Sequence, residues 1–376
     1  MTTSNFIPVN EPDLNGNEKK YLQECIETGW ISSEGPFVER LESGMANLTG
    51  RKHAFAVCNG SAALELAVKA TGVCPGDEVI MPSFTIISCA LAVIRAGAIP
   101  VYVDSDRTTF NMQVDRIEPL ITEKTKAIMA VHIYGITVDM NPLLEIAQKY
   151  KLRLIEDAAE VIGQTYKGKP CGSFGDISTF SFYPNKHVTT GEGGMVLVND
   201  DELSEKCKSL RNLCFGKADR FIHEEVGWNF RMSNLQAAVG VAQLERLPQT
   251  IQKKREIGGL YQEALNGIDL FNLPIPKTEY CENAYWVFGI LSRDQNKDAK
   301  WWVRKLATRG IGTRPFFHPM HKQPCLNHAT DTKLELPESE FLGKYGFYLP
   351  SGLTLARHEV EKIANALVSV MQDSDE

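Results

Sequence analysis

The sequence predicts an α/β fold in which a large, doubly wound and mostly parallel sheet lies between helices and a smaller α/β domain follows. Strand-like and helix-like segments alternate from residue 53 to about residue 200. The run at 127–133 (AIMAVHI) is almost continuously apolar, as is typical of a parallel strand buried on both faces. After residue 200 the alternation gives way to longer helical segments. We therefore expect a large domain over residues 1–250 and a small C-terminal domain over residues 251–376.

The first half of the chain supplies the elements of the large sheet. Helices are expected at 13–29, 38–48, from 62 onward, 83–96, 117–120 and 142–150, and strands at 53–58, 77–82, 99–104, 127–133 and 152–156. In such sheets ligands bind at the carboxyl ends of the strands, so residues that directly follow a strand are the first candidates for a site.

The second half is richer in amphipathic helices. They are expected at 201–213, 233–247, 251–265, 301–309 and 359–371, with strands at 286–290 and 312–317. The segment 214–231 is loop-like, and 273–277 (LPIPK) is typical of a loop at a domain boundary.

The composition excludes several classes of function. The 376 residues are 43% hydrophobic and 23% charged, with a formal net charge of −7. An acidic chain without a basic run is a poor nucleic-acid binder, and no apolar stretch approaches the ~20 residues of a membrane span. The nine cysteines form no CxxC pair, so we expect reduced thiols and no metal site. No signal peptide is evident at the N-terminus, and a cytoplasmic location is expected.

A lysine lies between two strand-like runs. The stretch 178–199 reads STFSFYPNKHVTTGEGGMVLVN, in which Lys186 precedes a glycine-rich bend. Two strands that flank such a bend would hold Lys186 at a strand edge facing a cleft. Because the pKa of a lysine falls readily on burial, this side chain suits Schiff-base chemistry with an aldehyde. A surface lysine in a hairpin loop is the alternative interpretation.

Three further features complete a possible site. The segment 59–62 turns from a strand into a helix whose exposed amides favour an anion such as phosphate, although Ser61 could simply cap the helix. Asp157 follows a buried strand and could pair with a protonated pyridine nitrogen, or cap a helix. Ser181, just before Lys186, could donate to the same phosphate. Together these are the parts of a pyridoxal 5'-phosphate (PLP) site.

Stretches along nearly the whole chain resemble the DegT/DnrJ/EryC1/StrS family of sugar aminotransferases, which has the aspartate aminotransferase-like fold of PLP enzymes (fold type I). The most specific are GSFGDISTFSFYPNKHVTTGEGGMV and WNFRMSNLQAAVGVAQLERL, supported by NGSAALELAV, GDEVIMPSFT, VHIYG and LIEDAAEVIG. The resemblance implies a homodimer with shared active sites. It also implies transfer of the amino group of L-glutamate to a keto or aldehydo sugar, in the synthesis of lipopolysaccharide or another bacterial surface polysaccharide.

The resemblance also implies roles for individual residues. Lys186 resembles the lysine that binds the cofactor's aldehyde and moves the proton, and Asp157 resembles the partner of the pyridinium nitrogen. Phosphate contacts are implied for the helix start at Gly60, Ser61 and Ala62 and for Ser181. Glu160 matches a position near the cofactor ring and its 3′-oxygen, and Asn229 one that reaches a phosphate from the second subunit.

Two positions depart from the family pattern. Ile86 stands where the family often has an aromatic residue stacked on the cofactor ring, and it can still pack there. His187 follows Lys186, whereas dehydratases of the family have His in place of the lysine itself. Because neighbouring side chains of a strand-like segment point to opposite sides, we expect His187 to point away from the imine. His187, Arg231 and Arg314 are candidates for substrate binding.

The substrate stays open between several alternatives. The phrases VHIYG, GNEKKYL and NKHVTTGEGGMV are most similar to family members that aminate C4 of a GDP-linked 4-keto-6-deoxymannose. Ile86 and the context 183–185 keep open a transaminase that forms 8-amino-3,8-dideoxy-manno-octulosonate from an 8-oxo-octulosonate. Other classes are a sugar dehydratase using pyridoxamine phosphate, against which an intact Lys186 argues, and a PLP-binding regulator without turnover.

Overall fold

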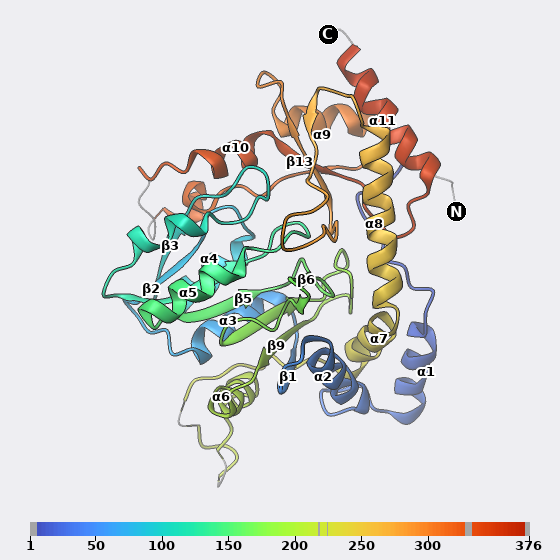
Figure 1. The fold of residues 1–376 in the computed structure, drawn as a ribbon. Coiled ribbons are helices and arrows are strands. Elements are labelled where there is room, and N and C mark those ends of the chain that lie inside the picture. The colour runs from blue at the N-terminus through green and yellow to red at the C-terminus, as the bar shows by residue number, and fades with distance from the viewer. Residues whose placement is uncertain (1–5, 217–218, 224, 328–332, 373–376) are drawn as a thin grey trace.

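A seven-stranded sheet is the largest element of the computed structural model, which describes residues 6–216, 219–223, 225–327 and 333–372 (Figure 1). The strand order is β1-β9-β8-β5-β4-β2-β3. Neighbouring strands from β8 to β3 are parallel, whereas β9 is antiparallel to both β1 and β8. The strands are β1 (His53–Val57), β2 (Glu78–Pro82), β3 (Ile99–Val103), β4 (Thr125–Val131), β5 (Arg153–Asp157), β8 (Ile177–Ser181) and β9 (Gly194–Val198). The prediction of a mostly parallel sheet is confirmed.

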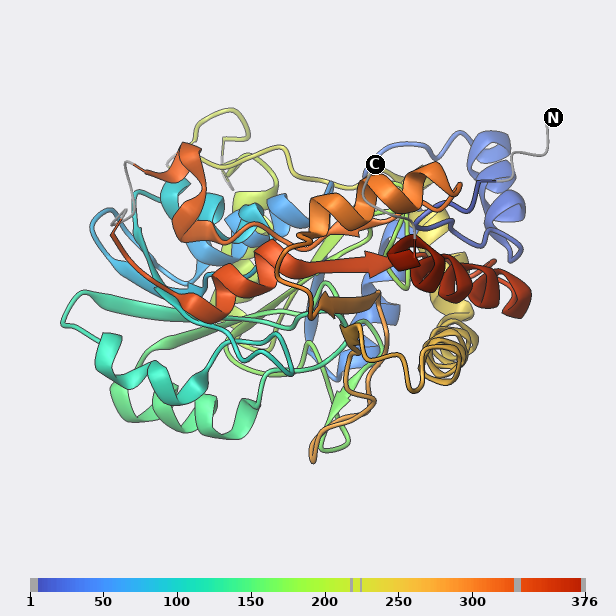
Figure 2. The same ribbon diagram turned by 90° about the horizontal axis from the view of Figure 1, so that it is seen from above.

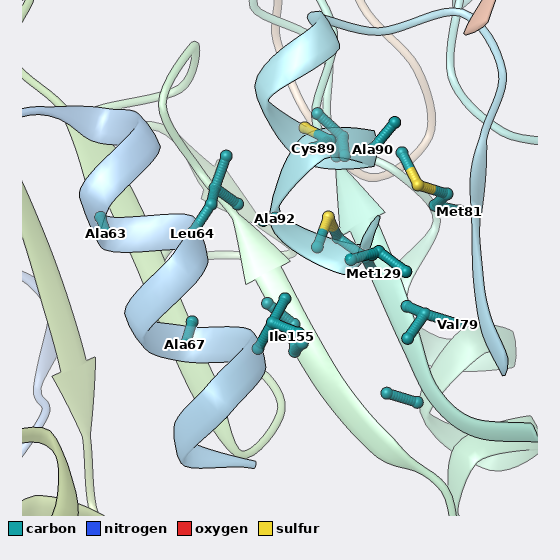
Figure 3. Close-up of a cluster of buried hydrophobic side chains, with 14 of the residues drawn as sticks. Ala63, Leu64, Ala67, Val79, Met81, Cys89, Ala90, Ala92, Met129 and Ile155 are labelled. Atoms are coloured by element: carbon teal, nitrogen blue, oxygen red, sulfur yellow. The ribbon is translucent and has the colours of Figure 1, made fainter. Parts of the chain in front are cut away.

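Helices cover both faces of this sheet. One face packs against α3 (Gly60–Ala70), α4 (Ile87–Arg95) and α6 (Asp201–Arg211), and Figure 3 shows α3 and α4 meeting side chains of the strands. The other face packs against α5 (Met140–Tyr150), and near β1 and β9 against α2 (Pro36–Thr49) and α7 (Asn234–Glu245), beside α1 (Glu18–Thr28). Along β4, Met129 belongs to the first core and Ile128 to the second, so this strand is buried on both faces as predicted.

A second sheet of four antiparallel strands, in the order β10-β11-β13-β12, lies in the C-terminal part. Its elements are β10 (Phe271–Asn272), β11 (Phe288–Ser292), β12 (Arg314–Pro315) and β13 (Gly346–Leu349), with α9 (Ala299–Thr308), α10 (Pro337–Tyr345) and α11 (Arg357–Gln372). In Figure 2, α10, β13 and α11 follow one another in a line of red. Trp302 and Phe347, both fully buried, lie at the centre of this core. The short elements elsewhere are β6 (Thr165–Tyr166), β7 (Lys169–Pro170) and the 3₁₀ turns at 114–116, 118–120, 320–322 and 324–326.

The helix α8 (Leu247–Ala264) joins the two parts, and in Figure 1 it runs from beside α7 to beside α11. Its first turn contributes Leu247 to the core under the large sheet. Its later turns contribute Ile257, Leu260 and Tyr261 to the C-terminal core. The expected boundary between residues 250 and 251 falls inside this helix, and the division into two domains stays a prediction.

Several expected elements were wrong in extent. The helix expected at 83–96 begins only at Ile87, because the Ser83 N–H donates to Val103 O and its Oγ lies 2.6 Å from His321 Nδ1. The strand expected at 312–317 is limited to β12, and before it the Gly312 N–H donates to Ile7 O and not to β13. The elements α10 and β13 were not predicted, since neither short segment has a clear periodicity. None of the helices in the described ranges is both long and apolar enough to cross a bilayer.

Candidate active site

A cavity of about 760 Å³ opens at the carboxyl edge of the large sheet. Asp157 ends β5, Ser181 ends β8 and Gly60 follows β1, and all three line the cavity because these strands run in the same direction and end at the same edge. The predicted site residues that line it are Gly60, Ser61, Ile86, Asp157, Glu160, Ser181, Lys186 and Arg314. Ala62, His187, Asn229 and Arg231 are not among the lining residues.

Lys186 lies in the loop that joins the antiparallel neighbours β8 and β9, and not at a strand edge as expected. Its backbone N–H donates to Tyr183 O, so the chain turns there. The Nζ atom lies 3.7 Å from Glu160 Oε1 and 3.7 Å from the centre of the Trp286 ring. Burial lowers the pKa of Lys186, although the neighbouring carboxylates Glu160 and Asp157 oppose this shift.

Asp157 is a buried carboxylate whose hydrogen-bond donors, among the described residues, are all neutral. Its Oδ1 accepts from Ala159 N–H at 3.1 Å and from Thr179 Oγ1 at 3.4 Å, and its Oδ2 from Cys89 Sγ at 3.4 Å. No helix follows Asp157 directly, so the helix-cap alternative is wrong. Burial raises its pKa, and in the described part of the chain no Lys, Arg or His forms an ion pair with it. A pyridinium N–H would supply the missing cationic donor.

Glu160 adds a second buried carboxylate next to Lys186. Its Oε2 accepts from the Tyr134 N–H at 2.9 Å. Burial raises the pKa of Glu160 to about 7, against the opposing attraction of Lys186. Two buried carboxyl groups thus face a single lysine, and this donor set fits a cofactor that carries a positive ring nitrogen.

The N-terminus of α3 lines the cavity with Gly60 and Ser61 and forms a cradle there. Asn59 caps the helix, since its side chain accepts from Ala62 N–H at 2.8 Å, so the alternative in which Ser61 caps the helix is wrong. The first amides of a helix have no acceptor within it, which leaves the N–H groups of Gly60 and Ser61 for an anion. A Cβ at Gly60 would lie 2.7 Å from Ser181 Cβ, so only glycine lets α3 approach β8 this closely. The cradle fits a phosphate group.

The remaining predicted residues lie outside the cavity. The Ala62 N–H is occupied by the Asn59 side chain. Asn229 is exposed and forms an isolated β-bridge with Asn212, whose side chain also accepts from Arg231. His187 is buried, and its Nδ1 lies 3.0 Å from Ile162 O, to which it donates. Its side chain therefore packs away from the cavity, although the loop that carries it is not a strand.

Trp286, Phe317 and Tyr348 line the cavity but were missed by sequence reasoning. They come from the C-terminal part, about 100 or more positions after Lys186, and no role at the site was predicted for any of them. Only the folded chain brings them to the lysine.

The buried group His132, Glu156 and Cys171 has the composition of a metal site but not its chemistry. His132 Nδ1 accepts from the Val138 N–H at 3.0 Å, so its Nε2 carries the hydrogen and donates to Glu156 Oε1 at 3.1 Å. Glu156 also accepts from the N–H groups of Gly172 and Phe174. A metal at Nε2 would require an imidazolate, and the group is better described as a hydrogen-bond network.

Acid is expected to destabilise the protein through His187. Burial lowers its pKa from 6.5 to about 3, so between these values the unfolded chain binds the proton and the folded protein does not. The contribution of neutral His187 to the free energy of unfolding is fully present above about pH 6.5. It decreases as the pH falls, by about 2 kcal/mol at pH 5. The free energy of unfolding, measured with denaturant at pH 8 and at pH 5, should fall between these two pH values by about 2 kcal/mol less in His187→Asn than in the wild type. His358→Asn, a substitution at an exposed histidine, should leave the decrease in the free energy of unfolding between pH 8 and pH 5 as it is in the wild type.

Comparison with known proteins gives consistent matches. The model of the DegT/DnrJ/EryC1/StrS aminotransferase family matches residues 12–368. The GDP-perosamine synthase of Caulobacter vibrioides is 42% identical over 97% of this chain and 98% of its own length, and that of Vibrio cholerae is 40% identical over 96% and 98%. The PLP-form of Spr1654, a putative sugar aminotransferase from Streptococcus pneumoniae, superposes with a TM-score of 0.90 at 26% identity, covering 98% of this chain and 99% of its own.

Proposed function

Because the chain belongs to the DegT/DnrJ/EryC1/StrS aminotransferase family, we propose that it transfers the amino group of L-glutamate to C4 of GDP-4-keto-6-deoxymannose. The chain is a PLP-dependent sugar aminotransferase with the aspartate aminotransferase-like fold. The two GDP-perosamine synthases, similar to it along almost their whole length, support the choice of sugar. The product would enter a bacterial surface polysaccharide such as lipopolysaccharide, and the enzyme would act in the cytoplasm.

One observation supports this reaction most strongly. The cavity brings together a buried lysine, two buried carboxyl groups and an open helix N-terminus. A lysine alone is compatible with many functions, and so is a helix N-terminus. Their meeting in one cavity matches the aldehyde, the ring nitrogen and the phosphate of a single PLP molecule.

Lys186, Asp157 and Ile86 have separate roles in the proposed reaction. When bound, PLP carries the amino group between the two substrates and withdraws electrons from the reacting carbon. Lys186 Nζ would bind the aldehyde of the cofactor and would move a proton at the reacting carbon, and its lowered pKa leaves more of the amine free to act as a base. Asp157 would hold the proton on the ring nitrogen. Ile86, which is 42% exposed at the cavity, offers an apolar surface to the ring.

The phosphate contacts can be tested at Gly60. Gly60→Ala adds a methyl group 2.7 Å from Ser181 Cβ, which forces the helix start or Ser181 to move. We expect the apoenzyme to bind PLP about tenfold more weakly, as a titration followed by absorbance would measure. The matched control is Gly259→Ala in α8, where an added Cβ meets nothing within 4 Å and affinity should not change. Equal affinities in all three proteins would remove Gly60 from the proposed phosphate site.

Arg314 is the one of our three substrate candidates that lines the cavity. Its side chain is exposed on β12, and we assign it to an anionic group of the substrate, either the diphosphate of the sugar nucleotide or a carboxylate of glutamate.

We also propose a homodimer in which Asn229 reaches the cofactor of the second subunit. Asn229 is exposed in the segment 214–231, which also exposes Phe221, Ile222 and Val226 by 80%, 60% and 83%. An apolar surface of this kind next to Asn229 supports its burial against another copy of the chain.

The two half-reactions can be followed by absorbance. Glutamate alone should convert the yellow enzyme to its amino form and release 2-oxoglutarate. GDP-4-keto-6-deoxymannose should then restore the yellow form at least tenfold faster than an 8-oxo-octulosonate, because the cavity must recognise a different anion and sugar in each case. The reverse preference would replace the proposed sugar. A yellow enzyme that does not respond to glutamate would contradict amino transfer from this donor.

A further inference from the structure

Lys254 on α8 is a fully buried lysine, and it has no role in the proposed reaction. It is 2% exposed, and its Nζ donates to Trp286 O at 3.0 Å and to Ser351 O at 2.5 Å. In the described ranges no carboxylate forms an ion pair with it. Burial lowers its pKa to about 7. Burying an amine without a counter-charge is costly, so a leucine or methionine would serve better if this position only filled space.

The first carbonyl that Lys254 holds belongs to Trp286, a wall of the cavity. The indole Nε1–H of Trp286 donates to Asn185 O at 2.7 Å, and the ring lies 3.7 Å from Lys186 Nζ. Trp286 therefore contacts both the lysine and the backbone of the residue before it. Lys254 fixes the main chain from which this indole projects.

The second carbonyl that Lys254 holds belongs to Ser351, whose side chain is hydrogen-bonded to the start of β11. Ser351 Oγ accepts from Phe288 N–H at 3.0 Å, at the start of β11, and the Ser351 N–H donates to Val9 O. Through its two hydrogen bonds Lys254 links α8 to two segments that line the cavity, one at Trp286 and one at Ser351. In Figure 1, α8 is the long helix that runs past this sheet.

We propose that Lys254 is a positioning residue for Lys186, acting through Trp286. By its hydrogen bond to the Trp286 carbonyl, Lys254 fixes the distance between the indole ring and the Lys186 amine. The ring in turn limits the orientations that this amine can adopt. This role rests on the proposed reaction only in taking Lys186 as the group that moves the proton. A ring face over the amine also stabilises its positive form, so a displaced indole changes both its position and its basicity.

A double-mutant cycle separates this role from simple support of the fold. The variants are Lys254→Met, Trp286→Ala and the double variant, with Lys253→Met as the matched control. Lys253 is the neighbouring, partly exposed lysine of α8, 3.2 Å from Glu256. The readouts are kcat and KM of the glutamate half-reaction and the visible circular dichroism of the bound cofactor. Wild-type turnover with glutamate is measured first and tests the proposed function by itself.

We expect Lys254→Met to lower kcat about tenfold with less than a twofold change in KM, and to weaken the dichroism of the bound cofactor. In the Trp286→Ala background the same substitution should lower kcat by less than twofold, and Lys253→Met should change neither quantity. Equal losses in both backgrounds, or an unchanged kcat with only a lower melting temperature, would overturn the proposal. If Lys254→Met does not fold, Lys254→Gln, which keeps a donor for one carbonyl, is put through the same cycle with the same criteria.

Discussion

Lys186→Ala is expected to abolish amino transfer and the yellow colour of the bound cofactor together. The alanine cannot bind the aldehyde, and no other amine lies within reach of Glu160 among the described residues that line the cavity. Loss of both the covalent link and the proton carrier should lower the rate of the glutamate half-reaction about 10⁴-fold or more. Absorbance spectra and 2-oxoglutarate release measure the two effects.

The control for this experiment is Lys186→Arg, which keeps a positive charge beside Glu160 but cannot form the imine. We expect it to be as inactive and as colourless as the alanine variant. Substantial turnover in the arginine variant would mean that the charge of Lys186, and not its covalent chemistry, supports the reaction. Turnover and colour in the alanine variant would contradict the site as a whole.

Asp157→Asn is expected to lower kcat/KM for glutamate by about 10²–10³-fold. The asparagine has the same shape but no charge, so it cannot hold the proton on the ring nitrogen, and the reacting carbon loses its electron sink. The buried environment that raises the pKa of Asp157 makes water a poor substitute. Steady-state kinetics and PLP affinity of the same preparation distinguish loss of chemistry from loss of the cofactor.

A second carboxylate at the same side of the sheet controls for folding effects. Asp139 precedes α5 and accepts from Tyr166 Oη, and it does not line the active-site cavity. Asp139→Asn should therefore change kcat/KM less than twofold. A loss in Asp157→Asn no larger than in this control would contradict the pairing with the ring nitrogen.

The sequence predicted those parts of the molecule that local patterns determine. The run at 127–133, apolar except for His132, predicted β4, because parallel strands buried on both faces carry nearly continuous apolar residues. Gly60 and Asp157 were found because each lies at or shortly after the end of a strand, and parallel strands bring their carboxyl ends together. Ser181 was found because it lies five residues before Lys186. The short β12 and β13 carry too few residues for a period, so their pairing could not be predicted.

The rest of the site depends on contacts between distant parts of the chain. Trp286 and Asn185, joined by a hydrogen bond, are 101 positions apart. Lys254 looks like an ordinary helical lysine beside Lys253, and only its burial distinguishes the two. The orientation of His187 was predicted correctly from a strand-like alternation, but the chain there is a loop, and a hydrogen bond to Ile162 O decides the result. Local spacing holds no information on such partners.

Because α8 is continuous between the two parts of the chain, it limits where the protein can be divided into fragments. A cut at residue 250 would divide an 18-residue helix and leave a stub that carries Leu247 on one fragment. The other fragment would keep Ile257 and Tyr261 on a helix without its first turn, and Lys254 would lie three to four residues from a frayed end. The two halves are therefore not interchangeable modules, and transplanting the C-terminal part between relatives requires carrying the whole of this helix with it.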